Sequence, residues 1–287
     1  MLLYRFLLDL QAIFTYHKHM QKLWNKKALF LYRVLDGQVR LVGGCVRDYL
    51  MHKRFQDRDM ATPLTPDEVL TCLKKNGIPY LDIGRIFGTI VAKVNGTPFE
   101  ITTLRKDIET DGRHAVVGFT KSWATDARRR DFTINALYAD TNGKIYDYTG
   151  GLKDLKKRHL RFIGSPQKRM EEDYLRLLRY FRFWARMGER VIDVRVQKAL
   201  PALIQKLGQL SVERRREELF KIITGPRAKT TLNLMRRLGV LNETLLSVPF
   251  SKKQRRFIAL KGLEKMLANF GFWEYKRTEG DVNEPKG

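Results

Sequence analysis

The alternation of apolar and polar residues divides the chain into a first part with strands and helices and a second part with helices only. Residues 18–36 carry apolar residues at helical spacing and predict an amphipathic helix. Short runs rich in apolar and β-branched residues, each of strand length, follow in the first half of the chain. They predict strands or hairpins at residues 39–42, 56–61, 88–94, 98–104 and 138–148.

Turn and capping residues mark the ends of several of these elements. The run Thr65-Pro66-Asp67-Glu68 predicts a helix start, with a threonine cap, a proline at the first position and acidic side chains in the first turn. Gly77 ends that helix. Asn95-Gly96 and Asn142-Gly143 are typical of tight hairpin turns. The remaining predictions are a short helix through Leu50, a polar loop at residues 105–114 and a helix at residues 123–137.

From Pro166 onward the apolar residues recur at helical spacing, with breaks at Gly188, Gly225 and Gly239. The sequence therefore predicts an α+β fold, in which a mixed sheet with flanking helices precedes an all-helical part. The predicted domains are a sheet-containing domain at residues 1–160, a helical domain at 161–224 and a smaller helical domain at 225–287.

The chain is strongly basic. Its 287 residues carry a formal net charge of +24, and 43% of them are hydrophobic, which is enough for a packed core. Because clustered cations release counterions from phosphates, we expect a polyanionic partner such as nucleic acid. A generally basic proteome is the alternative explanation. The basic residues occur in blocks at residues 128–130, 156–158, 214–216 and 252–256.

Cysteine content and hydropathy bear on the compartment. Cys45 and Cys72 supply neither a disulfide framework nor zinc-ligand spacing, and they favour a reducing environment. No apolar run is long enough to span a bilayer, so no membrane association is expected. Residues 2–16 are apolar but contain Arg5 and Asp9. They fit a weak organellar address, a short helix or a segment ahead of a second start, and their role stays open.

A pair of aspartates, Asp57 and Asp59, follows an apolar strand that ends in Gly43-Gly44. Glycines without Cβ atoms let backbone N–H groups approach a phosphate. On an extended segment, carboxylates two residues apart point to one face, as ligands of Mg²⁺ would. Glu100, on the predicted strand at residues 98–104, is the candidate third carboxylate, although a solvent-exposed strand position explains it equally well. Together these residues suggest nucleotidyl transfer, in which two cations stabilise the attacking and leaving oxygens.

Residues 129–136 concentrate polar side chains around two apolar positions. On the predicted helix, Asp131 and Asn135 are four residues apart and share a face. Both side chains can hydrogen-bond ribose hydroxyls, and Arg129 and Arg130 can bind phosphates. The alternative is a surface helix with an Asp–Arg pair.

A third cluster, at residues 171–183, places Asp173 and Arg176 three residues apart on one helix face. On composition alone it is an ordinary ion pair. The pairing edges of cytosine and adenine both offer an amino donor beside a ring-nitrogen acceptor. These edges match a carboxylate that accepts and a guanidinium that donates. Uracil and guanine show the reverse pattern, and such a mismatch can be rejected roughly 10⁴-fold.

These stretches resemble the motifs of the tRNA nucleotidyltransferases of the bacterial and eukaryotic class, relatives of bacterial poly(A) polymerase within the polymerase-β-like superfamily. The resemblance runs from about residue 38 to about residue 222. It implies a nucleotidyltransferase head, followed by helical neck, body and tail domains. The matching stretches are Gly43–Asp48, Asp57–Asp59, Arg129–Ala136 and Glu172–Phe183.

The resemblance also implies roles for individual residues. Asp57, Asp59 and Glu100 correspond to the catalytic carboxylates that bind metal, with Mg²⁺ as the cofactor. Residues 105–119 align with a flexible loop that helps the change from C to A addition. The matching nucleotide-binding positions are Gly43, Gly44, Arg47, Arg130, Asp131, Asn135, Glu172, Asp173, Arg176 and Arg179. Of these, Glu172, Asp173 and Arg176 align with the amino-acid template that selects CTP and ATP, and residues 211–219 match a neck motif taken as structural.

The implied function is template-independent addition or repair of the 3′-terminal CCA of tRNA from CTP and ATP, with release of pyrophosphate. The expected location is a bacterial cytoplasm or an organelle matrix, and no protein partner can be inferred. The alternatives are a partial enzyme that adds only CC or only A, a poly(A) polymerase, or a non-catalytic RNA-binding protein on the same scaffold. Two features depart from the family pattern: the helical part after about residue 225 is shorter, and Phe87 stands where a histidine is expected.

Overall fold

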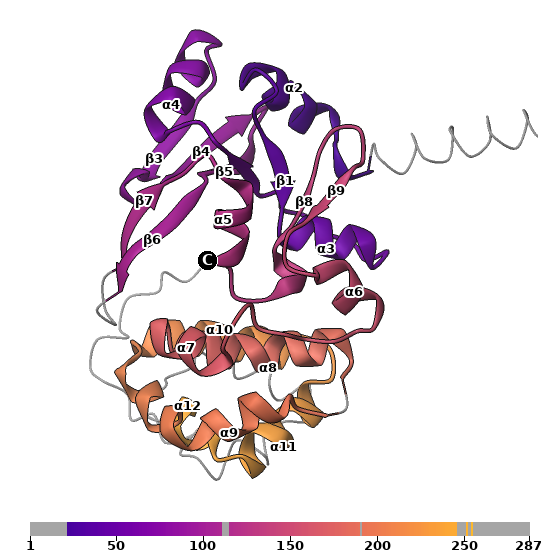
Figure 1. Ribbon diagram of the computed structural model, residues 1–287, viewed down its shortest axis with the longest axis vertical. Helices are drawn as coiled ribbons and strands as arrows, with labels where there is room; N and C mark the ends of the chain where they lie inside the picture. The colour runs from indigo at the N-terminus through magenta and orange to yellow at the C-terminus, as the bar shows by residue number, and fades with distance from the viewer. Residues whose placement is uncertain (1–21, 111–114, 190, 246–250, 252–253, 255–287) are drawn as a thin grey trace, which may run out of the picture. The chain divides into compact units, whose positions relative to one another are not determined.

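The computed structural model describes residues 22–110, 115–189, 191–245, 251 and 254 (Figure 1). Three regions with predictions lie outside these residues: residues 2–16, the tip of the predicted loop and most of the last basic block. The chain folds as two compact units, Met1–Ser165 and Pro166–Gly287. We call them the N-terminal unit and the helical unit, and each is described by itself.

The N-terminal unit contains a seven-stranded mixed sheet among its described residues. Strand β2 pairs with β5 in parallel, and the other neighbours in this sheet are antiparallel. A separate hairpin is formed by β6 and β7. The sheet order is β3 (Tyr80–Gly84), β4 (Thr89–Val94), β5 (Thr97–Thr103), β2 (Met60–Thr62), β1 (Arg40–Val42), β8 (Leu137–Ala139) and β9 (Ile145–Asp147), and the hairpin strands are β6 (Arg105–Thr110) and β7 (Ala115–Phe119).

Short helices flank this sheet. Helix α4 packs on β4, and α3 packs on β1 and β8 (Figure 1). The predicted capping of α4 is confirmed, because Thr65 and Glu68 form a reciprocal capping box and Pro66 opens the helix. The helices of this unit are α2 (Lys26–Val34), α3 (Gly44–Leu50), α4 (Pro66–Lys75), α5 (Trp123–Arg128) and α6 (Gly151–Lys156), with 3₁₀ turns η1 (Arg85–Phe87) and η2 (Thr133–Asn135).

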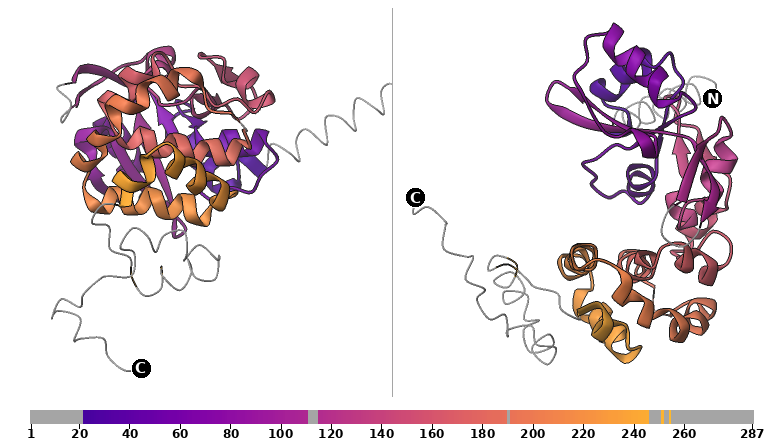
Figure 2. Two further views of the ribbon diagram at one scale, coloured as in Figure 1. Left: turned by 90° about the horizontal axis from the view of Figure 1, so that it is seen from below. Right: turned by 90° about the vertical axis from the view of Figure 1, so that its left-hand side faces the viewer.

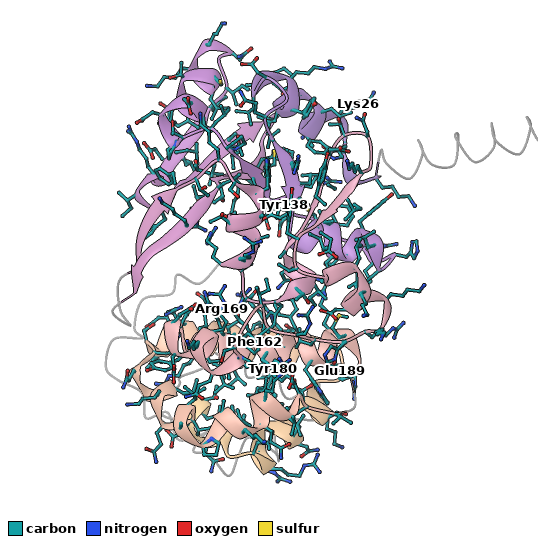
Figure 3. All side chains as sticks on the ribbon, viewed as in Figure 1. Lys26, Tyr138, Phe162, Arg169, Tyr180 and Glu189 are labelled. Atoms are coloured by element: carbon teal, nitrogen blue, oxygen red, sulfur yellow. The ribbon has the colours of Figure 1, made fainter. Side chains whose placement is uncertain are left out.

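The core of the N-terminal unit is built around the sheet. Tyr138 of β8, labelled in Figure 3, is fully buried, and Trp123 meets its ring edge-on with centroids 5.4 Å apart. Phe132 and Phe162 are also fully buried, with ring centroids 4.5 Å apart. These aromatic contacts fix the segment between α5 and β8 against the sheet, and this segment carries candidate site residues.

The helical unit begins at Pro166, and the predicted breaks at Gly188, Gly225 and Gly239 are confirmed. Helix α8 packs against α10 and α11. The right-hand view of Figure 2 shows several of these helices nearly end-on. The helices are α7 (Pro166–Glu172), α8 (Leu175–Met187), α9 (Val194–Leu203), α10 (Val212–Thr224), α11 (Ala228–Arg237) and α12 (Val240–Leu245), with the 3₁₀ turn η3 (Gln205–Gln209). No helix in the described part of the chain has the length and apolar character that crossing a membrane requires.

The predicted α+β fold, a mixed sheet with flanking helices followed by helices alone, is confirmed. Both predicted tight turns join antiparallel strands: Asn95 and Gly96 have positive φ between β4 and β5, and Gly143 has positive φ between β8 and β9.

The helix predicted at residues 123–137 is wrong beyond Arg128. The chain leaves α5, becomes extended at Phe132 (φ −120°, ψ 144°), turns through η2 and enters β8. Phe132 bridges to Phe162, and β8 pairs with β1, so non-local pairing overrides the local helical pattern.

Further elements of the N-terminal unit differ from the predictions. The polar loop expected from Arg105 onward is instead largely the β6–β7 hairpin. Strand β2 begins only at Met60, so residues 56–59 are irregular rather than extended sheet. Strand β3 and helix α6 were not predicted. Helix α6 starts at Gly151, where a Cβ would lie 2.2 Å from the Thr133 carbonyl oxygen, so only glycine fits.

Candidate active site

A glycine turn forms one side of the candidate site. Strand β1 ends at Val42. Gly43 follows with φ 73° and ψ −121°, a backbone conformation that residues other than glycine rarely adopt. The Gly43 N–H donates to the Leu137 carbonyl (3.1 Å), so this N–H is committed to the sheet. A Cβ at Gly43 would make only ordinary contacts, with the Asn135 carbonyl at 3.6 Å and Arg130 Nη1 at 3.8 Å. The turn therefore needs glycine for its backbone conformation, and it lies beside the Arg130 guanidinium.

The three candidate carboxylates lie near this turn. The Asp59 carbonyl accepts from the Val42 N–H (2.9 Å), which ties the acidic segment to the end of β1. In the parallel pairing of β2 with β5, Met60 lies opposite Ile101, so Asp59 and Glu100 each come one residue before a paired position. The strand pairing thus puts Glu100 beside Asp59, although forty residues separate them in sequence. Asp57 and Glu100 are exposed, whereas Asp59 is partly buried.

The pKa of Asp59 also indicates that these carboxylates lie close to one another. Burial, then Glu100, then Asp57 raise the pKa of Asp59 to about 6, while Arg130 and Arg47 act in the opposite direction. Asp59 therefore has two carboxylates and two guanidinium groups close enough to affect its charge. Asp57 and Asp59 lie outside the strand in which they were predicted, because β2 starts at Met60, after both of them.

The donor set suits a hard divalent cation in chemistry, since carboxylate oxygens are the ligands that Mg²⁺ takes. Burial and the neighbouring carboxylates raise the pKa of Asp59 more than Arg130 and Arg47 lower it, so the carboxylates carry negative charge that a cation would offset. Among the described residues, however, no three His, Cys, Asp or Glu side chains converge closely enough to hold a metal ion as they stand. The side chains that would hold such an ion are the exposed Asp57 and Glu100 and the partly buried Asp59.

Arg47, Asn135 and Asp131 form a buried network beneath the glycine turn. Arg47 donates from Nε and Nη2 to Asp48 (2.9 and 3.0 Å) and from Nη1 to Asn135 Oδ1 (2.6 Å). Asn135 Nδ2 in turn donates to Asp131 Oδ1 (3.2 Å). The prediction that Asp131 and Asn135 come together holds, but through the η2 turn and not on one α-helix face. In this structure the three side chains are 5–8% exposed and brace α3 against η2.

Arg130 is held by Asp126, a carboxylate that is not among the predicted site residues. Arg130 donates from Nε and Nη2 to Asp126 Oδ2 (3.1 and 3.0 Å), and Arg129 donates in the same way to Oδ1 (2.9 and 2.7 Å). The spacing of three and four residues from Asp126 to the two arginines is the local signal that could have identified this carboxylate.

In the helical unit, the cluster at residues 171–183 is divided by a break between α7 and α8. Glu172, at the end of α7, accepts from Arg169 Nη1 (2.6 Å) and from Arg176 Nη1. Asp173 lies in the break, and both of its oxygens accept from Arg214 Nη2 (3.0 and 3.1 Å). The expected pair of Asp173 with Arg176 on one helix face is therefore wrong: the partner of Arg176 is Glu172.

Two predicted residues remain: Gly44 opens α3, and Arg179 is on α8, where its guanidinium lies 5.6 Å from the Phe183 ring centroid. Arg214, which the sequence analysis treated as part of a structural motif, contacts Asp173 from the first turn of α10. Only the fold reveals this contact, because the two residues are about forty positions apart. Phe87, where a histidine was expected, is 53% exposed, and its carbonyl accepts from Arg105 Nη1 (2.8 Å).

Comparisons with known proteins place this geometry in context. Residues 39–161 match the family model described as poly A polymerase head domain. Residues 191–250 match the family model described as the probable RNA and SrmB-binding site of polymerase A.

Two curated relatives illustrate the similarity. The chain is 42% identical over 210 residues to the mitochondrial CCA tRNA nucleotidyltransferase 1 of Danio rerio. The matched stretch covers 72% of this chain and 49% of the relative. It is 41% identical over 186 residues to the CCA-adding enzyme of Oceanobacillus iheyensis. This second match covers 64% of this chain and 45% of that protein. The chain thus spans about half the length of the curated relatives it matches.

Among solved structures, the fold is similar to that of the Bacillus stearothermophilus CCA-adding enzyme in complex with CTP. The TM-score is 0.68 at 31% identity, over 82% of this chain and 57% of that chain. The Thermotoga maritima CCA-adding enzyme complexed with tRNA shares the fold with a TM-score of 0.64.

Proposed function

The chain belongs to the family of the CCA-adding enzymes and poly(A) polymerases, and on this basis we propose that it adds or repairs the 3′-terminal CCA of tRNA. CTP and ATP are the substrates, and pyrophosphate leaves. The observation that carries the proposal is the grouping of Asp59 with Glu100 and Asp57 beside the Gly43 turn and Arg130. Such a grouping suits transfer of a nucleotide from a triphosphate to a hydroxyl.

In this proposal Asp57, Asp59 and Glu100 hold Mg²⁺, which would stabilise charge on the attacking hydroxyl and on the leaving pyrophosphate. Arg130 neutralises charge on the triphosphate, and the Gly43 turn lets the chain pass close to it. Arg47, Asp131 and Asn135 brace the turn from beneath. Positioning and charge stabilisation by these groups supply most of the rate.

Base selection in this proposal depends on the break between α7 and α8. Glu172 fixes Arg176, and Asp173 presents a carboxylate whose side chain is 33% exposed. An accepting carboxylate and a donating guanidinium match the pairing edges of cytosine and adenine and mismatch those of uracil and guanine. The structure of a similar enzyme in complex with CTP supports this choice of nucleotide.

The decisive experiment incubates tRNA that lacks its 3′-terminal CCA with CTP alone, ATP alone and both, and sequences the products. We expect CC with CTP alone and CCA with both. CC or A as the longest product would identify a partial enzyme, and a long adenosine tail would identify a poly(A) polymerase. Asp57→Ala should abolish incorporation while leaving the fold intact.

A non-catalytic RNA-binding protein on the same scaffold is the alternative of another class, and the blocks of basic residues favour RNA binding as such. RNA binding without any binding of CTP in the presence of Mg²⁺ would support that alternative. We further propose a catalytic head at residues 1–160, a nucleotide-selecting neck at 161–224 and an RNA-binding region at 225–287. The relatives include bacterial and mitochondrial proteins, so a bacterial cytoplasm or an organelle matrix is proposed as the location.

A further inference from the structure

Asp126 is a buried carboxylate whose oxygens are occupied by cations and other donors. It lies on α5 with 1% of its surface exposed. Oδ1 accepts from Arg129 Nε and Nη2 and from the Arg105 backbone N–H (3.1 Å). Oδ2 accepts from Arg130 Nε and Nη2 and from the Tyr138 hydroxyl (2.7 Å). Burial alone raises the pKa of Asp126, but Arg130 and Arg129 outweigh it and hold this pKa well below the usual range, so the group is ionised.

The contacts of Asp126 fix the direction of the Arg130 guanidinium. Asp126 takes the Nε–Nη2 edge, while Nη1 at the other end lies 3.8 Å from the place of a Gly43 Cβ. The Tyr138 hydroxyl accepts from Arg130 Nε (3.2 Å) while it donates to Asp126, which locks the arginine from a second side. Arg130 is also one of the two cations that act on Asp59. Asp126 thus acts through Arg130: it orients a guanidinium that borders the Gly43 turn.

A free arginine side chain has about 2 kcal/mol of rotamer entropy to lose when it binds an anion. An arginine that is already fixed by a buried carboxylate and a tyrosine has lost that freedom before the ligand arrives. We propose that Asp126 is a positioning residue for the triphosphate of the incoming nucleotide, acting by holding Arg130 toward the Gly43 turn. This inference rests on the proposed function, because it assumes that a nucleoside triphosphate occupies that turn.

A purely structural role for Asp126 would be the competing explanation, because its contact with the Arg105 N–H also anchors the start of β6. Asp154 offers a matched control in the same unit. It is buried, with 6% of its surface exposed, and accepts from Thr133 Oγ1 (2.6 Å) and from Arg161 Nε (2.9 Å). Asp154 is not among the groups with the largest effects on the pKa of Asp59. A loss of stability alone should therefore affect Asp126→Asn and Asp154→Asn alike.

The test measures binding of CTP and of CMP to the full chain by calorimetry in the presence of Mg²⁺. CTP and CMP share base and ribose. The dissociation constant of CMP divided by that of CTP therefore reports contacts with the β- and γ-phosphates, and this ratio falls when CTP binding alone weakens. We expect Asp126→Asn to weaken CTP binding about tenfold, which is the effect of one or two charge-assisted hydrogen bonds, and to leave CMP binding unchanged. Asp154→Asn should keep the wild-type ratio. Tyr138→Phe, which keeps the ring and loses only the hydroxyl, should lower the ratio by a smaller factor of about three.

The outcomes separate the inference from the proposed function. A wild-type protein that binds CTP no better than CMP would refute a triphosphate site and with it the proposed function. A wild-type preference for CTP that Asp126→Asn and Tyr138→Phe leave intact would refute the positioning role alone. If Asp126→Asn does not fold, Tyr138→Phe decides: a lowered ratio supports the role and an unchanged ratio overturns it.

Discussion

At the scale of single residues, Asp59 carries an unfavourable charge in the free protein. It is partly buried and repelled by Glu100 and Asp57, with a pKa of about 6, so at pH 7 it is mostly ionised in the folded state. We predict that Asp59→Asn raises the free energy of unfolding by about 1–2 kcal/mol in Mg²⁺-free buffer at pH 7, after allowance for solvent screening. It should also remove most of the stabilisation that Mg²⁺ gives the wild type.

Urea unfolding with EDTA and with Mg²⁺ checks both parts of the Asp59 prediction. Asp140→Asn is a control, because Asp140 is a carboxylate of the N-terminal unit that accepts from the Tyr146 hydroxyl (3.1 Å) and is not among the groups with the largest effects on Asp59. A variant at Asp59 that is less stable than the wild type in EDTA would contradict the repulsion argument.

Gly43 has a backbone conformation that a side chain strains. We predict that Gly43→Ala costs about 1–3 kcal/mol of stability, and that nucleotide binding weakens because the turn shifts beside Arg130. Gly77→Ala is a matched control: Gly77 also has positive φ (62°), but it follows the end of α4, and a Cβ there would have no atom, Arg130 included, within 4 Å. Thermal unfolding and CTP titration of both variants check the prediction, which fails if the two variants bind CTP equally well.

At the scale of elements, the break between α7 and α8 sets the positions of the proposed template residues. Glu172 holds Arg176 across this break while Asp173 faces Arg214. We predict that Glu172→Gln frees Arg176 and lowers the preference for CTP over UTP, measured as the ratio of kcat/KM values, by about tenfold or more. Glu171→Gln is the control, because the neighbouring Glu171 is exposed and accepts a hydrogen bond from Gln167 Nε2 (2.9 Å) on its own helix. Equal preferences in the two variants would argue against the template role.

Asp126 connects three elements, because it lies on α5 and accepts from the Arg105 N–H of β6 and from the Tyr138 hydroxyl of β8, besides the arginines that follow α5. Its pKa in the folded protein lies below that in the unfolded chain, which is about 3.9. Its ionised form therefore stabilises the fold fully above about pH 5, and this contribution declines as the unfolded chain takes up a proton below about pH 4.

We accordingly predict that Asp126→Asn costs about 3–5 kcal/mol near pH 7 and less at pH 4. Urea unfolding of wild type and variant between pH 4 and pH 8 measures this difference. A difference that grows toward acid would reverse the expected sign and would mean that Asp126 is not ionised in the folded protein.

At the scale of the whole molecule, the net charge of +24 governs how the chain meets RNA. If six or more phosphates are contacted, the affinity for tRNA should fall by about 10³-fold or more between 50 and 200 mM salt. CTP binding should change much less, because it depends on a few fixed groups. Filter binding across this range of salt checks the prediction, and a nearly flat salt dependence for tRNA would exclude phosphate contacts as the main source of affinity.

The sequence by itself determined the features that depend on a few neighbouring residues. The capping box at Thr65, the hairpin turn at Asn95-Gly96 and the helix ends at Gly188 and Gly225 were all predicted from local residue types. The α+β order of the fold followed from the change of apolar spacing at Pro166. These features are local because caps and turns are set by the conformational preferences of single residues.

Only the tertiary structure decided which distant residues meet. The parallel pairing of β2 with β5 brings Glu100 beside Asp59, and α10 brings Arg214 to Asp173. The segment after Arg128 reads as a helix in isolation, yet burial of Phe132 and pairing of β8 with β1 draw it into the sheet. Burial and strand pairing are gained between segments far apart in sequence, so no local pattern contains the information that selects them.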